Sequence, residues 1–120
     1  MAIKHQIQNT ENYLLVTTSG IDDNLVQVQE YAQSVIDAAH RYESMNILCD
    51  ERFLTYNLST FDTFELANSA SQYAKFCRKI AIVCNPNSLE AGKFYETVSQ
   101  NRGLTVKIFT DLSEAEEWLK

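Results

Sequence analysis

The chain has 120 residues, of which 45% are hydrophobic and 22% charged, a composition typical of one globular domain over residues 1–120. Its net charge is −6, and its ten Lys and Arg residues are scattered along the sequence. The absence of a basic stripe argues against binding to nucleic acid or to an anionic membrane. No segment approaches the roughly 18 consecutive apolar residues of a membrane span, and the N-terminus has no apolar run of signal-peptide length. We therefore expect a cytoplasmic protein.

The cysteines and histidines do not form a pattern that predicts a metal site or a cofactor. Cys49, Cys77 and Cys84 are odd in number and lack Cys-x-x-Cys spacing, so we interpret them as buried free thiols of a reducing compartment. His5 and His40 have no second His or Cys at ligand spacing. We expect neither a metal nor a cofactor.

Two strands are predicted at the start of the chain. In residues 3–8, Ile3 and Ile7 alternate with polar residues, which is the period of an edge strand with one wet face. A turn then leads to a β-branched, apolar strand at 13–19, and we expect the two to pair as an antiparallel hairpin.

A long amphipathic helix is predicted within residues 21–42. Apolar residues recur at spacings of three and four, as Leu25, Val28, Ala32, Val35, Ala39 and Tyr42. Asp22 and Asp23 precede this stripe, where carboxylates cap a helix and oppose its dipole.

Strands and helices alternate in the rest of the chain. Strands are predicted at 45–50, 79–85 and 104–111, and helices at about 61–77, from 85 to Gly103, and at 113–120. The segment 50–62 between strand and helix is expected to be a long irregular loop. The order ββαβαβαβα predicts an α/β fold with a mostly parallel five-stranded sheet and an antiparallel N-terminal edge strand. Ligands of such sheets bind at the carboxyl ends of the strands.

Aromatic residues are concentrated next to that edge of the sheet. Six of them fall within 24 residues, namely Phe53, Tyr56, Phe61, Phe64, Tyr73 and Phe76. Two interpretations stay open: these rings complete the core, or they line an apolar pocket or a partner-binding face.

Polar residues at the same edge give a weaker signal. The pairs Asp50 with Glu51 and Asp22 with Asp23 are adjacent in sequence, and adjacent strand residues point to opposite faces, so neither pair predicts acid–base catalysis. A site formed by Asp50, Arg52 and Asn85 is the one enzyme-like combination left open, and we expect a non-enzymatic protein.

Ser59 and Thr60 precede the second predicted helix, where a hydroxyl can cap the helix or accept a phosphate. Asp62 and Glu65 in the first turn would repel a phosphate, and Arg52 is the one local counter-charge. The local charges therefore favour the capping role.

The sequence resembles the SpoIIAA-like branch of the STAS superfamily in three stretches: YLLVTTSGIDD, RKIAIVCN and NRGLTVKIFTDLSEAEEWL. The resemblance covers nearly the whole chain, and it implies a SpoIIAA-like (βα) superhelix shared with anti-sigma-factor antagonists and CRAL-TRIO lipid-binding domains. It also implies a phosphorylated Ser in an Asp-Ser-Ser/Thr-Gly motif at the start of the second helix. Here Asp50 is not followed by Ser and Gly, so Ser59 or Thr60 would be a displaced acceptor.

Two classes of function follow. The first is a STAS-like regulatory module that binds a partner protein through residues 50–62 and the second helix. The second is a carrier or sensor of a small apolar or lipid-like molecule, with a pocket lined by the aromatics of 53–76. Asp50, Arg52, Phe53, Tyr56, Phe61, Phe64 and Asn85 are the candidate binding residues in either case. An edge strand or exposed aromatic loop also favours a homodimer.

Overall fold

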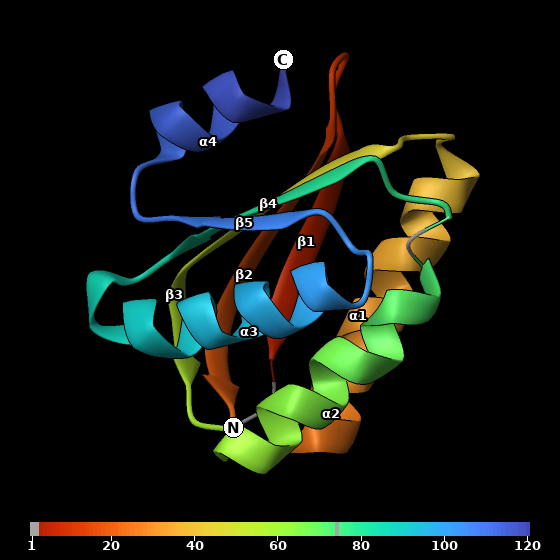
Figure 1. The fold of residues 1–120 in the computed structure, drawn as a ribbon. Helices are drawn as coiled ribbons and strands as arrows, with labels where there is room; N and C mark the ends of the chain where they lie inside the picture. The colour runs from red at the N-terminus through yellow and green to blue at the C-terminus, as the bar shows by residue number, and fades with distance from the viewer. Residues whose placement is uncertain (1–2, 74) are drawn as a thin grey trace.

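A computed structural model describes residues 3–73 and 75–120, and it contains one five-stranded sheet in the order β1-β2-β3-β4-β5 (Figure 1). The strands are β1 (Lys4–Asn9), β2 (Leu14–Asp22), β3 (Asn46–Tyr56), β4 (Lys79–Cys84) and β5 (Val106–Phe109). β1 is antiparallel to β2, and all other pairs are parallel. The predicted fold class and strand order are therefore confirmed. The homodimer expected from the β1 edge stays a prediction.

Helices cover both faces of this sheet unequally. They are α1 (Leu25–Arg41), α2 (Thr60–Ala70), α3 (Leu89–Asn101) and α4 (Leu112–Leu119), with short 3₁₀ turns at Ser71–Tyr73 and Pro86–Ser88. Figure 1 shows α1, α2 and α3 on one face and α4 alone on the other. The parallel crossovers therefore form two layers of core, one on each side of the sheet.

The larger core lies under α1, α2 and α3, and includes Leu14, Val16, Ile47, Cys49, Ile82, Cys84, Val106 and Ile108 from the strands. The smaller one packs Leu48, Ala81 and Val83 against Ala115 and Leu119 of α4. Strand residues thus alternate between the two layers, as the pleat requires.

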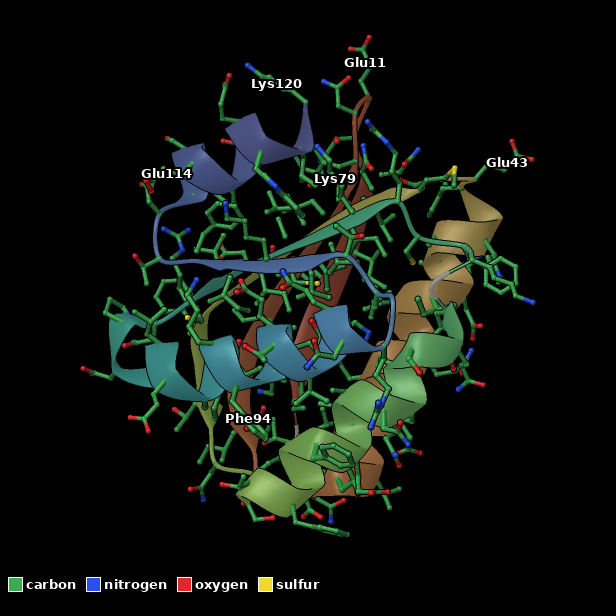
Figure 2. The ribbon with its side chains drawn as sticks, viewed as in Figure 1. Glu11, Glu43, Lys79, Phe94, Glu114 and Lys120 are labelled. Carbon is green, nitrogen blue, oxygen red and sulfur yellow. The ribbon has the colours of Figure 1, made fainter. Side chains whose placement is uncertain are left out.

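A lysine of β4 also holds α4 to the sheet. The Lys79 ammonium donates a hydrogen bond to the Trp118 carbonyl at 2.8 Å and lies 5.1 Å from the centre of the Trp118 ring. In Figure 2 Lys79 lies beside α4, while Glu11, Glu43 and Glu114 project away from the fold. Trp118 and Leu119 therefore anchor the last helix, which the sequence predicts at 113–120.

The strand predicted at 45–50 is wrong in length, because β3 continues to Tyr56 and β2 continues to Asp22. The two strands pair along this extension, where Asp22 lies opposite Tyr56. The long irregular loop predicted at 50–62 is consequently wrong, and only residues 57–59 separate β3 from α2.

Two other boundaries differ from the predicted ones. The α-helix predicted at 61–77 ends at Ala70 and tightens into a 3₁₀ turn; Ala74, which the prediction included, lies outside the described residues. The cap of α1 is Asn24, whose Oδ1 accepts from the Gln27 amide at 3.1 Å, and not Asp22 or Asp23. Because β2 extends to Asp22, this residue belongs to the strand and its carboxylate does not cap α1.

Candidate functional site

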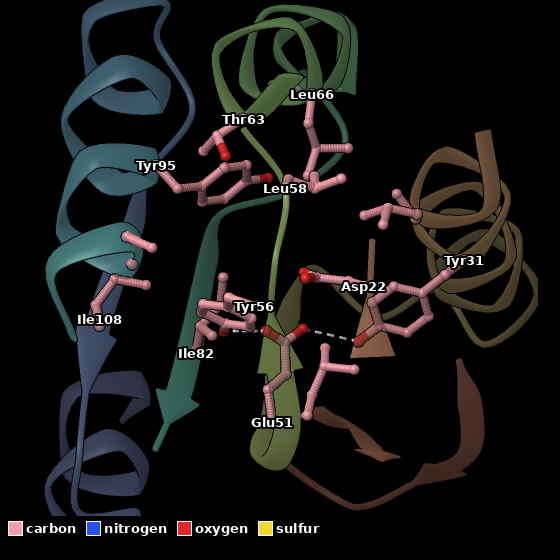
Figure 3. A pocket seen from close by; sticks show the side chains of 15 residues that line it. Asp22, Tyr31, Glu51, Tyr56, Leu58, Thr63, Leu66, Ile82, Tyr95 and Ile108 are labelled. Atoms are coloured by element: carbon pink, nitrogen blue, oxygen red, sulfur yellow. Dashed lines mark hydrogen bonds between the residues drawn. The ribbon is translucent and has the colours of Figure 1, made fainter. Parts of the chain in front are cut away.

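A cavity of about 100 Å³ lies between the sheet and helices α1, α2 and α3, where β2 and β3 end (Figure 3). Most of its wall is apolar, including Val28, Ala32, Leu54, Leu58, Leu66, Ile82, Ala91, Gly92 and Ile108. Its polar lining residues are Asp22, Glu51, Tyr31, Tyr56, Thr63 and Tyr95. We call this space the acidic cavity. It occupies the strand edge at which ligands of parallel sheets bind.

Glu51 holds the centre of a hydrogen-bonded cluster on the cavity floor. The Tyr31 hydroxyl of α1 donates to Glu51 Oε2 at 3.0 Å, and the Tyr56 hydroxyl of β3 donates to Oε1. Figure 3 shows the two bonds converging on this carboxylate from opposite sides. The Glu51 residue is only 7% exposed, and burial raises the pKa of its carboxyl while the tyrosine hydrogen bonds oppose that rise.

Asp22 supplies the second carboxyl, from the last residue of β2. Its Oδ1 accepts from the Asn57 amide at 2.7 Å, and no other residue in the described part of the chain donates a hydrogen bond to its Oδ2. The residue is 7% exposed. Burial raises the pKa of the Asp22 carboxyl to about 7, with a smaller contribution from the Glu51 charge.

An irregularity in β3 brings Glu51 and Tyr56 to the same cavity although they are five residues apart. Thr17 of β2 pairs with Asp50 and Ser19 pairs with Phe53, so two residues of β3 lie opposite one residue of β2. This is the count of a β-bulge. Because side chains alternate along a regular strand, the extra residue is what lets Glu51, Leu54 and Tyr56 all line the cavity.

The titratable groups that line the acidic cavity are carboxyls and phenols. None of its fifteen lining residues among the described part of the chain is Lys, Arg or His. Burial also raises the pKa values of Tyr31, Tyr56 and Tyr95, so these phenols remain neutral donors and acceptors. The arrangement suits a ligand that donates hydrogen bonds or bears positive charge, and it disfavours an anion.

A second, smaller cavity of about 80 Å³ adjoins the first. Five residues line both, namely Tyr31, Ala32, Glu51, Ile82 and Tyr95. The others are nearly all apolar, including Val35, Ile36, Ile47, Ile80 and Leu104. The polar side of the two cavities is therefore near Asp22, and the apolar side lies further along α1, beside Val35 and Ile36.

The polar residues Asp50, Arg52 and Asn85 do come together, but away from the acidic cavity. The Arg52 guanidinium donates to both Asp50 oxygens at 2.8 Å, and the Asn85 amide donates to the Arg52 carbonyl at 3.4 Å. The hydrogen bonds from Arg52 lower the pKa of Asp50. This ion pair satisfies Asp50 locally.

The predicted aromatic residues divide between several places. Tyr56 lines the acidic cavity, whereas Phe53 and Phe61 are 71% and 69% exposed. Phe64 is partly buried, with the Arg102 guanidinium 5.3 Å from its ring centre. The two most exposed rings therefore belong to the surface and not to a pocket wall.

Ser59 is the N-cap residue of α2, and Thr60 is the first residue of that helix. The Ser59 Oγ accepts from the Asp62 amide at 3.1 Å, and both residues are exposed. Capping by Ser59 is thus confirmed, and phosphorylation stays a prediction.

Sequence reasoning missed Asp22, Tyr31, Glu51 and Tyr95 as site residues. Asp22 and Glu51 each have an acidic neighbour in the sequence, and only the register of β2 on β3 brings the two together. Tyr31 follows Val28 by three and precedes Val35 by four, so the helical stripe contained a signal for it.

Within residues 3–73 and 75–120, no group of three or more His, Cys, Asp and Glu is placed to share a metal ion. In the same part of the chain, no helix is long and apolar enough to cross a membrane.

Solved structures of two proteins resemble this chain over nearly its whole length. An anti-sigma factor antagonist from Mycobacterium paratuberculosis matches with a TM-score of 0.68 at 12% identity, covering 98% of this chain and 94% of that one. An uncharacterised protein with a SpoIIAA-like fold from Shewanella loihica matches with a TM-score of 0.63 at 18% identity. The match covers 99% of this chain and 94% of that one. No protein-family model matches the sequence, and no curated protein matches it. The chain therefore has the SpoIIAA-like fold that its sequence predicts.

Proposed function

We propose that this chain is a non-enzymatic regulatory module that binds a partner protein through the end of the molecule where its parallel strands finish. The support is a fold similar to that of an anti-sigma factor antagonist, combined with exposed apolar side chains at that end. These side chains are Val26, Phe53, Phe61 and Leu89, which we call the carboxyl-end patch. Large exposed apolar groups on a domain surface commonly mark a protein interface.

The carboxyl-end patch is assembled by topology. Val26, Phe61 and Leu89 lie in the first turns of α1, α2 and α3, and each of these helices follows a strand that ends at this edge. Figure 1 shows α2 beginning beside the end of β3. Residues distant in sequence thus share one end of the molecule.

Acidic residues beside the carboxyl-end patch favour a partner with a basic surface. Asp23 and Glu90 are exposed near the starts of α1 and α3, and the whole chain has a net charge of −6. A partner with apolar anchor residues surrounded by Lys and Arg would complement this surface, and opposite charge would speed its association.

The test begins with affinity capture from the source cells, followed by purification of the captured protein and measurement of its Kd for this chain. Replacing Phe53 and Phe61 together by Ala should weaken binding at least about tenfold, since buried aromatic anchors contribute most of an interface's free energy. Phe76→Ala is the matched control, because Phe76 is 47% exposed but precedes β4 at the opposite end. Equal Kd values for the two variants would contradict the proposal.

Phosphorylation at Ser59 or Thr60 would place a charge at the start of α2, next in sequence to Phe61 of this interface. Ser59 is exposed at the start of α2, between Phe53 and Phe61 in sequence. Arg52 is engaged by Asp50, however, so a phosphate here would meet Asp62 without that counter-charge. Intact-mass measurement of protein purified from its own cells tests this switch, and a mass without added phosphate under all growth conditions would remove it.

A second candidate function, the sensing of a small molecule, is favoured by the acidic cavity. A cavity with a mostly apolar wall and a few convergent polar groups is the usual form of a small-ligand site. Of the aromatic residues of 53–76 predicted to line a pocket, Tyr56 lines the acidic cavity and Tyr73 lines the adjoining one. Native mass spectrometry of the purified protein with added ligands would show a bound adduct if this candidate holds.

A further inference from the structure

We propose that the acidic cavity binds a small primary amine with an unbranched apolar chain, its ammonium beside Asp22 and its chain in the adjoining apolar cavity. This inference rests on the second candidate function and gives the chemical class of its ligand. It is independent of the partner interface at the carboxyl-end patch.

The lining residues determine the sign of the ligand's charge. Asp22 and Glu51 are both 7% exposed, and their wall contains no basic side chain among the described residues. Removing an ionised carboxylate from water is costly unless a positive charge or hydrogen-bond donors accompany it. A fatty acid or phosphate ester would add a further acidic group to a space that already holds two carboxyls, whereas an ammonium would stabilise their ionised forms.

Asp22 and Glu51 differ in how many hydrogen bonds their carboxyl oxygens already accept. Glu51 already accepts from the Tyr31 and Tyr56 hydroxyls, one on each oxygen. Asp22 accepts the Asn57 amide on Oδ1, while no other described residue donates to its Oδ2. Figure 3 shows the Asp22 carboxylate in the open space between Tyr31 and Leu58. Asp22 is therefore the group that contacts the ammonium, and Glu51 adds to the negative potential.

The volumes of the two cavities limit the apolar part of the ligand. An apolar protein cavity of about 150 Å³ accommodates benzene. The acidic cavity of about 100 Å³ holds less than that, and the adjoining one adds about 80 Å³ along a wall that includes Ile47, Ile80 and Leu104. An elongated chain of about six carbons suits two small spaces that share a wall better than a ring system or a lipid does.

The experiment compares hexylamine, 1-hexanol and hexanoate, which share one chain and differ in their polar end. Each is titrated into protein with labelled methyl groups, and binding is followed by NMR. Methyl signals of Leu58, Leu66, Ile82 and Ile108 report on the acidic cavity, and those of Leu119 under α4 serve as an internal control. We expect hexylamine to shift the cavity signals with a Kd at least tenfold below that of hexanol, and hexanoate to cause no shift.

Variants assign the ammonium site. Asp22→Asn keeps an oxygen for the Asn57 amide but removes the charge, so it should weaken hexylamine binding at least tenfold. Asp23→Asn is the matched control, because Asp23 is exposed and does not line the cavity. Equal weakening in both variants would overturn the assignment.

The outcomes separate this inference from the functions it accompanies. Equal binding of hexanol or hexanoate would overturn the amine class while leaving a small-molecule sensor in place. Absence of binding by all three would overturn both, and the partner interface would still be judged by the Phe53 and Phe61 variants alone.

Discussion

Asp50 and Glu51 are adjacent in β3, and their carboxylates lie on opposite faces of the sheet. Asp50 lies on the same face as Leu48, toward α4, and its carboxylate pairs with the Arg52 guanidinium. Glu51 lies on the same face as Cys49, lines the cavity under α1 and accepts hydrogen bonds from the Tyr31 and Tyr56 hydroxyls. The same two neighbouring residues therefore have pKa values shifted in opposite directions, downward for Asp50 by its hydrogen bonds with Arg52 and upward for Glu51 by burial.

Replacing Glu51 by Ala should lower the free energy of unfolding by about 2–3 kcal/mol, because two buried tyrosine hydroxyls would lose their acceptor. Glu51→Gln should cost less, since its carbonyl oxygen still accepts one of these bonds. Urea denaturation at pH 7 measures the change. Glu11→Ala, in the exposed β1–β2 turn, is the control, and a Glu51→Ala protein as stable as this control would contradict the role of the cluster.

Asp22 should make the protein less stable as the pH rises. Its pKa is about 3.8 when unfolded and about 7 when folded, so the folded state binds more protons between these values and stability falls over that range. Asp22→Asn has no carboxyl to ionise, so its free energy of unfolding should exceed that of the wild type by about 2–4 kcal/mol at pH 8. Below pH 4 the two free energies should be equal. Denaturation at several pH values tests the slope. Asp23→Asn should keep most of the wild-type slope, because the Asp23 charge is among the smaller causes of the raised pKa of Asp22. An unchanged slope in Asp22→Asn would refute the assignment.

Ser59 should stabilise α2 as its cap. Ser59→Ala removes the acceptor for the Asp62 amide and should cost about 1 kcal/mol, whereas Ser59→Asp should cost little because Asp caps helices as well as Ser does. Thermal unfolding measures both, with Thr60→Ala as the control at the next position. An Ala variant as stable as wild type would count against the cap. A stable Asp variant also separates any effect of negative charge on partner binding from an effect on folding.

The three cysteines should react slowly with alkylating reagents in the folded protein. Cys49, Cys77 and Cys84 are buried and free, and burial raises the pKa of the Cys77 thiol to about 11. Because the thiolate is the reactive form, we expect alkylation at pH 7.5 to be at least about 100-fold slower than in urea-unfolded protein. Mass spectrometry after a timed reaction reads out each site, and native-state labelling at the unfolded rate would show that site to be accessible.

Much of the fold could be predicted because it follows from periodicity. The α1 stripe, the apolar run of β4 and the stop at Gly103 each reflect a local physical requirement that the sequence displays directly. Gly103 takes a φ of +89°, which glycine adopts without strain, and its amide donates to the Gln100 carbonyl. Such features need no knowledge of distant residues.

The acidic cavity could not be predicted in the same way. Asp22 and Glu51 meet through the register of β2 on β3, and Tyr31 reaches Glu51 from a helix packed across both strands. The polar residues at 50–52 also interrupt the apolar pattern, so the pattern predicts a strand end at the point where β3 bulges. Long-range pairing, and not local propensity, determines this site.

The bulge also affects how this protein can be compared with others of its fold. A relative whose third strand is regular would align with β3 only through a one-residue gap between Asp50 and Phe53. Without that gap, the exposed Phe53 would be matched to an inward-facing position, and Leu54 and Tyr56 to outward-facing ones. At identities of 12–18%, a single misplaced gap would therefore reverse the inferred roles of the residues that form the cavity wall.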